Sequence, residues 1–472
     1  MDTGWTAGSG SCRDGTVMLG RRGFLATAAV VTGSVIAAAP GGAARAATAG
    51  ASTAPRARLR LALPTPSGPY AVGTVALHLV DYSRQDPFLS TPGPRELMTS
   101  LWYPARRQRF AGSRYRAVPW IPPAADGLLL AQLIPQPLVQ ITLPGGGAGY
   151  EPGPPVSISL DGVSLPVTAA RPGVPLSPPP EGCPVVLYSP GEQVDREFGT
   201  TQAEDLASHG YIVVGIDHTY EAPEVVFPGG RIAVQVNPQP SQTTVLTTRI
   251  ADAQFVLDSL AAITRGINPD HEHRPLPGGL AGALDLPRTG MFGHSLGGDT
   301  AAQVMAVDDR VVAGLDLDGT IEPAVPFTPP QIDQLATDTA QKLDGRPFMF
   351  LCSAGVTPFK TPGKPEAAGI PGFWQGLSGW RLFLSMNGSA HFSYTDYEAF
   401  LSQLTAAGIV TASQADEVVT PYIGTIAPTQ AIAAQRAYIG AFFDLQLRHR
   451  NSHLLDGPSG RYPEIEFVAS GL

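Results

Sequence analysis

The residues of this chain whose types and spacing best suit catalysis are a serine set between glycines and a histidine far along the chain. Residues 293–297 read Gly-His-Ser-Leu-Gly. Apolar residues 291–292 predict the end of a buried strand, and residues 301–305 predict a helix. On such a turn Ser295 would stand clear of the sheet as a nucleophile, because flanking glycines permit a bend that leaves no room for a Cβ. An ordinary glycine-rich turn is the alternative interpretation.

A nucleophilic serine needs a base, and His391 is the histidine best placed to act as one. A serine hydroxyl is a poor nucleophile at neutral pH unless a histidine takes its proton and a carboxylate orients that histidine. His391 directly follows a predicted strand at residues 382–386. His449 and His453 trail the last predicted helix and should be solvated. We therefore predict His391 as the general base.

The orienting carboxylate is predicted to be Asp318. The loop after the predicted strand at residues 348–351 has no carboxylate, whereas the preceding strand ends in Asp316 and Asp318. Alternation along a regular strand would place both carboxylates on one face, so periodicity does not choose between them. Sites in such sheets lie beyond the carboxyl ends of the strands, and Asp318 is the later residue, followed by Gly319. Asp316 should lie further from the carboxyl end of the strand than Asp318 and hydrogen-bond to the backbone or to a neighbouring side chain.

The elements that must position these residues form an alternating pattern of short apolar strands and helices. Two strands, 74–80 and 97–103, predict an opening hairpin, and residues 225–234 predict a second hairpin. Further strands are predicted at 185–188, 211–216, 311–317, 348–351 and 382–386, with helices around 246–260 and 429–448. This alternation predicts a single α/β domain over residues 71–460, with a mostly parallel sheet covered by helices on both faces.

A long insert precedes the third strand. Residues 105–181 are rich in Pro and Gly, carry leucines around 128–130 and predict a short hairpin at 156–167. An insert of this length is either a cap over the active site or a surface excursion packed on its own leucines, and the sequence leaves both open. Residues 47–70 should form a flexible arm.

The N-terminal residues 1–46 have the layout of an export signal. Arg21-Arg22 precede an apolar run, and Ala44-Arg45-Ala46 forms a small-x-small cleavage site, which is typical of the twin-arginine route. The run of about 16 residues is shorter than the roughly 20 that a membrane-spanning helix needs. We therefore expect a secreted protein.

Composition excludes some partners. Without residues 1–46 the chain keeps 27 basic and 38 acidic residues, a net charge of −11, which disfavours nucleic acid and anionic membranes.

Cys183 and Cys352 should be free buried thiols at opposite ends of the sheet. Residues 271–273, His-Glu-His, lack a third ligand nearby and do not predict a metal site. His218 either lines the pocket or packs.

Several motifs resemble the plasma-type platelet-activating factor acetylhydrolases and related bacterial lipases of the α/β-hydrolase superfamily. The family's G-H-S-x-G-G motif falls on residues 293–298, its L-D motif on 317–318 and its G-x-x-H-x-x-x-x-D-F/Y motif on 388–397. Shorter similarities lie at 101–104, 206–211 and 252–258. The resemblance covers residues 70–400 and implies an α/β-hydrolase fold.

The resemblance also implies acyl transfer. It assigns the nucleophile, base, acid and backbone oxyanion donors to Ser295, His391, Asp318 and the N–H groups of Leu296 and Glu192. Residues 189–193, Ser-Pro-Gly-Glu-Gln, depart from the family's S-H-G-x-G loop and are closer to bacterial cutinases. We expect a secreted serine esterase or lipase for short-acyl phospholipids or other lipid esters, with transient lipid-interface contact and without cofactor or obligate protein partner. A cutinase-like polyester hydrolase and an acyltransferase are the alternatives.

Overall fold

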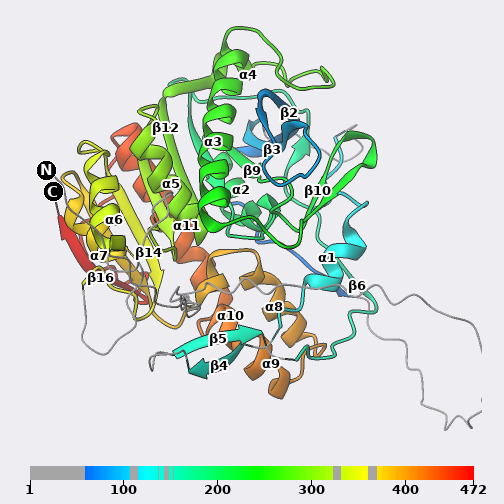
Figure 1. The fold of residues 1–472 in the computed structure, drawn as a ribbon, viewed down its shortest axis with the longest axis vertical. Helices are drawn as coiled ribbons and strands as arrows, with labels where there is room; N and C mark the ends of the chain where they lie inside the picture. Colours follow the sequence, from blue (N-terminus) through cyan, green and yellow to red (C-terminus); the bar gives the residue numbers. More distant parts are fainter. Residues whose placement is uncertain are drawn as a thin grey trace, which may run out of the picture.

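A ten-stranded sheet runs through the protein and organises it (Figure 1). The computed structural model describes residues 59–106, 115–136, 138–142, 148–152, 154–322, 331–359 and 369–471. From one edge to the other the strands are β16 (Ile465–Gly471), β15 (Arg381–Met386), β14 (Phe348–Ser353), β13 (Val311–Leu317), β12 (Leu284–His294), β8 (Cys183–Ser189), β9 (Ile212–Asp217), β3 (Pro94–Ala105), β2 (Ala71–Gln85) and β7 (Arg171–Pro172). The strands from β15 to β9 are parallel, and β16 and β3 join this block antiparallel.

Helices cover both faces of the sheet because its central strands are apolar on both sides. Every residue of β8 and of β9 is buried. One face packs against α3 (Gln242–Thr264), α5 (Leu296–Val307), α6 (Ile332–Gln341) and α7 (Ile370–Gly376), and the other against α2 (Thr200–Ser208) and α11 (Pro428–Arg448). Figure 1 shows α3 and α5 side by side in front of the sheet. The predicted α/β fold is confirmed.

Most predicted elements occur where the sequence places them, with two differences. The hairpin predicted at 225–234 is present as β10 (Glu224–Val226) and β11 (Ile232–Val234). The hairpin predicted at 156–167 is wrong within the described residues 154–167: β6 (Val163–Ser164) pairs parallel with β1 (Leu59–Arg60). Prolines at 154, 155 and 166 lack the N–H groups that a ladder needs. The sheet also extends past residue 460, because β16 adds an edge strand.

The insert packs against helices that follow His391 in the chain. It contains α1 (Asp126–Gln132), β4 (Leu138–Thr142) and β5 (Ala148–Pro152). Leu129 and Leu133 join a core cluster with α8 (Tyr397–Ala406), α9 (Ala412–Val418) and α10 (Thr420–Ile423). Leu61, within the expected arm, is buried in the same cluster. The predicted leader and residues 47–58 lie outside the described residues.

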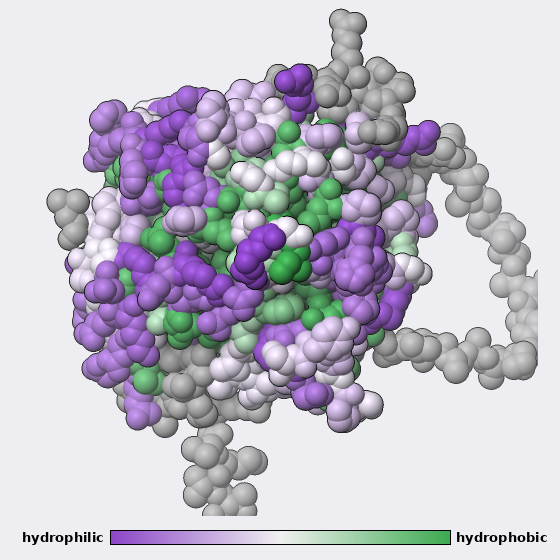
Figure 2. Space-filling model, turned by 90° about the horizontal axis from the view of Figure 1, so that it is seen from above, coloured by the Kyte–Doolittle hydropathy of each residue, from purple (hydrophilic) through white to green (hydrophobic). Residues whose placement is uncertain are grey.

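The structure also shows the character of the surface and the state of the two cysteines outside the predicted leader. Figure 2 shows one face of the molecule, on which apolar side chains interleave with hydrophilic ones. None of the helices in the described ranges is long and apolar enough to cross a membrane. Cys183 and Cys352 are buried free thiols, as predicted, and burial raises the pKa of Cys183 to about 12.

Candidate active site

Ser295 stands on a sharp turn between β12 and α5. Its backbone has φ 56° and ψ −125°, a conformation that L residues rarely adopt and that is typical of functional sites. A Cβ on Gly293 would lie 2.2 Å from the carbonyl carbon of Gly297, and one on Gly297 would lie 2.0 Å from the Ser189 oxygen. The glycines are therefore required by close backbone approach, and the turn has the strand-to-helix context of a nucleophile elbow.

Three residues predicted from sequence form one hydrogen-bonded chain. His391 Nε2 lies 3.0 Å from Ser295 Oγ, and His391 Nδ1 lies 2.8 Å from Asp318 Oδ2. The other Asp318 oxygen accepts hydrogen bonds from the Ser353 N–H and hydroxyl at 2.6 and 2.7 Å. Burial alone would raise the pKa of Asp318, but the hydrogen bonds from His391 and Ser353 outweigh it and lower the pKa. An ionised Asp318 can thus fix the His391 tautomer that accepts a proton from Ser295.

Asp316 is held apart from this chain. Its Oδ1 accepts the Gly319 N–H at 2.7 Å, and burial raises its pKa well above the usual range. The strand ends at Leu317 and Asp318 has φ 56°, so the alternation that left the two carboxylates equivalent is broken at that residue. Of the remaining histidines considered, His449 and His453 are exposed, in line with the expectation of solvated side chains.

His294, which sequence analysis did not single out, supports the histidine loop. Its Nε2–H donates to the His391 carbonyl at 2.8 Å, and the two rings lie 4.6 Å apart between centroids. Burial, followed by the neighbouring His391, lowers the pKa of His294 to about 3. His294 therefore stays neutral and acts as a donor that positions the backbone of His391. The only signal in the sequence was its place in the glycine motif.

Replacing His294 with Gln should make stability less sensitive to acid. The unfolded histidine binds a proton near pH 6.5 and the folded one does not until about pH 3, so acidification through this window favours the unfolded state. The wild-type free energy of unfolding should fall relative to the variant by up to about 1.4 kcal/mol per pH unit below pH 6.5. Urea unfolding between pH 8 and 4.5 measures this. His453→Gln, at an exposed position, is the control, and parallel curves for wild type and His294→Gln would contradict the assignment.

Arg249 binds the backbone of the loop that carries the predicted oxyanion donor Glu192. The Arg249 guanidinium donates to the carbonyl oxygens of Pro190 at 2.7 Å and Gly191 at 2.9 Å. It is almost fully buried and pairs with Glu221. No hydrogen-bond acceptor for the N–H groups of Glu192 and Leu296 occurs among the described residues, so both remain available to a ligand. The sequence did contain a signal for Arg249, because it is a charged residue on the apolar face of the helix predicted around residues 246–260.

His218 extends this support network. Its Nε2 lies 3.0 Å from Ser189 Oγ and its Nδ1 lies 3.0 Å from Asp252 Oδ2. Asp252 in turn forms an ion pair with the buried Arg95 at 2.8 Å. The open question about His218 is thereby answered, because it packs beneath the loop.

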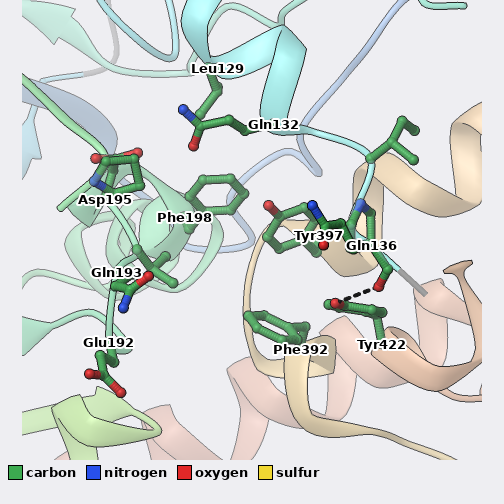
Figure 3. A pocket seen from close by; sticks show the side chains of 14 residues that line it. Leu129, Gln132, Gln136, Glu192, Gln193, Asp195, Phe198, Phe392, Tyr397 and Tyr422 are labelled. Atoms are coloured by element: carbon green, nitrogen blue, oxygen red, sulfur yellow. Dashed lines mark hydrogen bonds between the residues drawn. The ribbon is translucent and has the colours of Figure 1, made fainter. Parts of the chain in front are cut away.

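Glu192 also lines a cavity whose wall includes Phe392, the residue after His391. Figure 3 shows its carboxylate directed away from the aromatic side chains of that cavity. Burial, followed by the negative charge of Glu221, raises the pKa of Glu192 to about 7. The side chain is therefore neutral more often at neutral pH than an exposed glutamate, which reduces repulsion of a negative charge that develops nearby.

The described residues do not form a metal centre. No group of three or more His, Cys, Asp or Glu side chains within them could hold a metal ion. In the segment 271–273, Glu272 instead pairs with His78 Nδ1 at 2.8 Å.

Comparison with known proteins places this geometry among esterases. No family model matches the chain. A probable 1-alkyl-2-acetylglycerophosphocholine esterase of Arthroderma benhamiae is 25% identical over 418 residues, covering 86% of this chain and 93% of the relative. The platelet-activating factor acetylhydrolase of Canis lupus familiaris is 24% identical over 285 residues, covering 55% of this chain and 56% of the relative.

A solved structure extends the comparison. The ferulic acid esterase from Streptomyces cinnamoneus is 30% identical, with a TM-score of 0.60, and the match covers 87% of this chain and 99% of that one. The sheet order, the helices on both faces and these relatives together confirm the fold and the resemblance drawn from the motifs. The chain belongs to an esterase family of the α/β-hydrolase superfamily that includes relatives named as platelet-activating factor acetylhydrolases.

Proposed function

We propose that the protein hydrolyses carboxylic esters through an acyl-enzyme on Ser295. The observation that carries the proposal is the hydrogen-bonded chain from Ser295 through His391 to Asp318. His391 Nε2 takes the Ser295 proton as Oγ attacks the ester carbonyl, and the N–H groups of Leu296 and Glu192 bind the oxygen that becomes negative. His391 then protonates the departing alkoxide. Water, activated by the same histidine, attacks the acyl-enzyme and releases the acid.

The proposal is tested by trapping the serine. A fluorophosphonate probe should modify Ser295 alone, found by mass spectrometry of the digested protein, because only a serine activated by a base displaces fluoride rapidly. Labelling should be lost in His391→Ala and retained in His449→Ala, which removes an exposed histidine. Labelling at another serine, or undiminished labelling of His391→Ala, would contradict the mechanism.

The substrate within this class is proposed from the relatives. The names of these relatives refer to an acetylated ether phospholipid and to ferulic acid esters. We propose carboxylic esters with short or aromatic acyl groups, against the polyesters that the loop at residues 189–193 left as an alternative. Initial rates on acetyl phospholipid, ferulate and polyester substrates separate the three, and a clear preference for polyester would reverse the choice.

We also propose that residues 1–46 direct export by the twin-arginine route and are removed. The support is the paired arginines before a short apolar run and the small residues at 44–46. Protein in the medium should begin near Ala47 by intact mass. The double variant Arg21→Lys, Arg22→Lys should remain in the cells, and a full-length chain in the medium would contradict cleavage.

A further inference from the structure

A cavity lies between the loop after β8 and the helices after His391. Its described lining comprises Leu129, Gln132, Ile134, Pro135, Gln136, Glu192, Gln193, Val194, Asp195, Phe198, Pro223, Phe392, Tyr397 and Tyr422. Glu192 and Phe392 connect it to the site, because Glu192 carries a predicted oxyanion N–H and Phe392 follows the base. An acyl group that extends from Ser295 past Glu192 and Phe392 would reach this cavity.

The cavity walls suit a flat apolar group. Phe198 and Tyr397 stack with ring centroids 4.5 Å apart, and Phe392 and Tyr422 stack at 5.1 Å. The Tyr422 hydroxyl is already occupied, since it donates to the Gln136 carbonyl at 2.9 Å (Figure 3). An aromatic ring in such surroundings gains from both burial and ring-to-ring contact.

One fully buried polar side chain of the cavity, Asp195, lacks a close hydrogen-bond partner. Asp195 is completely buried, and neither of its oxygens makes a close hydrogen bond with a described residue, although the Glu224 backbone N–H lies near enough to oppose the rise of its pKa. Figure 3 shows Asp195 on the wall opposite Tyr397, with Phe198 between them. A polar group that is buried without a close partner destabilises the fold, so such a group calls for a ligand or another explanation.

The protonation of Asp195 fits a neutral ligand. Burial, followed by the charge of Glu224, raises its pKa well above the usual range. A protonated carboxyl both donates and accepts, which matches a hydroxyl group.

We propose that this cavity binds an aromatic acyl group that bears a hydroxyl, and that Asp195 hydrogen-bonds that hydroxyl and sets specificity for it. The proposal rests on the proposed esterase function. The described lining contains acidic side chains and no Lys, Arg or His, so a phosphate would meet like charge without a counter-ion. A quaternary ammonium group could be attracted by the rings and carboxyls, but it has no donor for the unpaired oxygens.

The test compares esters that differ only in the hydroxyl. Wild-type kcat/KM for methyl 4-hydroxycinnamate should exceed that for methyl cinnamate at least about ten-fold, because a site built to bond a hydroxyl rejects the analogue that lacks it. Asp195→Leu should bring the ratio close to one, chiefly by lowering the rate on the hydroxylated ester. Asp195→Asn, which retains an acceptor, should keep part of the preference and guards against misfolding of the leucine variant.

Glu204→Gln provides a matched control, and a choline ester tests for a quaternary ammonium group as the alternative ligand. Glu204→Gln removes another buried carboxyl, one that accepts backbone N–H bonds from Ala169 and Ala170 outside the cavity, and should leave the ratio unchanged. An unchanged ratio in Asp195→Leu would overturn the proposal. The proposal would also be overturned if Asp195→Leu lost kcat/KM on butyrylcholine but not on 3,3-dimethylbutyl butyrate, its uncharged isostere. That result would indicate an ammonium site. Failure of the esterase function is distinguishable, since the wild type would then hydrolyse 4-nitrophenyl acetate no faster than Ser295→Ala does.

Discussion

Ser295→Ala is expected to reduce kcat on 4-nitrophenyl acetate by a factor on the order of 10⁶. Removing the nucleophile of a serine hydrolase leaves only the contribution of the oxyanion donors and substrate binding, and a loss of this size was measured in the worked protease example. KM should change little, because Ser295 Oγ makes its bond to the carbonyl carbon after binding. Initial-rate kinetics on the purified variant measure both constants.

A serine elsewhere provides the control for this substitution. Ser259 is buried in α3 and donates to the Phe255 carbonyl of its own helix at 2.9 Å. Ser259→Ala should retain the wild-type kcat within a few-fold. If Ser295→Ala kept more than about a hundredth of the activity, another nucleophile would have to carry the reaction.

The central strands and the serine turn were predictable because their signals are local. Short apolar runs such as residues 311–317 gave a strand with the bounds that the structure shows, and the glycines around Ser295 mark a turn whose need for space is evident from the motif alone. Parallel strands buried on both faces give continuous apolar runs, which are easily recognised. The edge strand β16 was missed since only part of it is buried and it lies beyond the long helix that seemed to close the domain.

The support for the site was not predictable, because its contacts join distant parts of the chain. Arg249 reaches the loop at residues 189–191 from some 60 residues away, and Asp252 pairs with Arg95 across 157 positions. Neither pairing leaves a periodic pattern. The turn at Asp318 is also hidden from periodicity, since its positive φ departs from a strand at a residue other than glycine. The sequence alone could single out Ser295, His391 and Asp318 as candidates, whereas the network that supports them depends on the fold.

Asp318→Asn should lower kcat strongly, whereas Asp316→Asn should affect mainly stability, although only one residue separates the two aspartates. Asp318 is ionised by its hydrogen bonds and contacts His391 Nδ1 at 2.8 Å. An asparagine there can stabilise the wrong histidine tautomer, a change that cost about 10⁴ in kcat in the worked protease example. We expect a loss of that order with an unchanged circular dichroism spectrum.

Asp316 is the matched control because it is an aspartate on the same strand. Its buried carboxyl has a raised pKa and bonds the Gly319 N–H, so an amide of the same shape replaces a largely neutral group and can still accept that bond. Asp316→Asn should keep kcat within about ten-fold and change stability by about 1–2 kcal/mol, the usual scale for one altered buried hydrogen bond. Steady-state kinetics and urea unfolding on both variants decide the matter. If Asp316→Asn abolished kcat while Asp318→Asn retained more than about a tenth of it, the orienting carboxylate would be Asp316, and the Asp318–His391 contact would be structural.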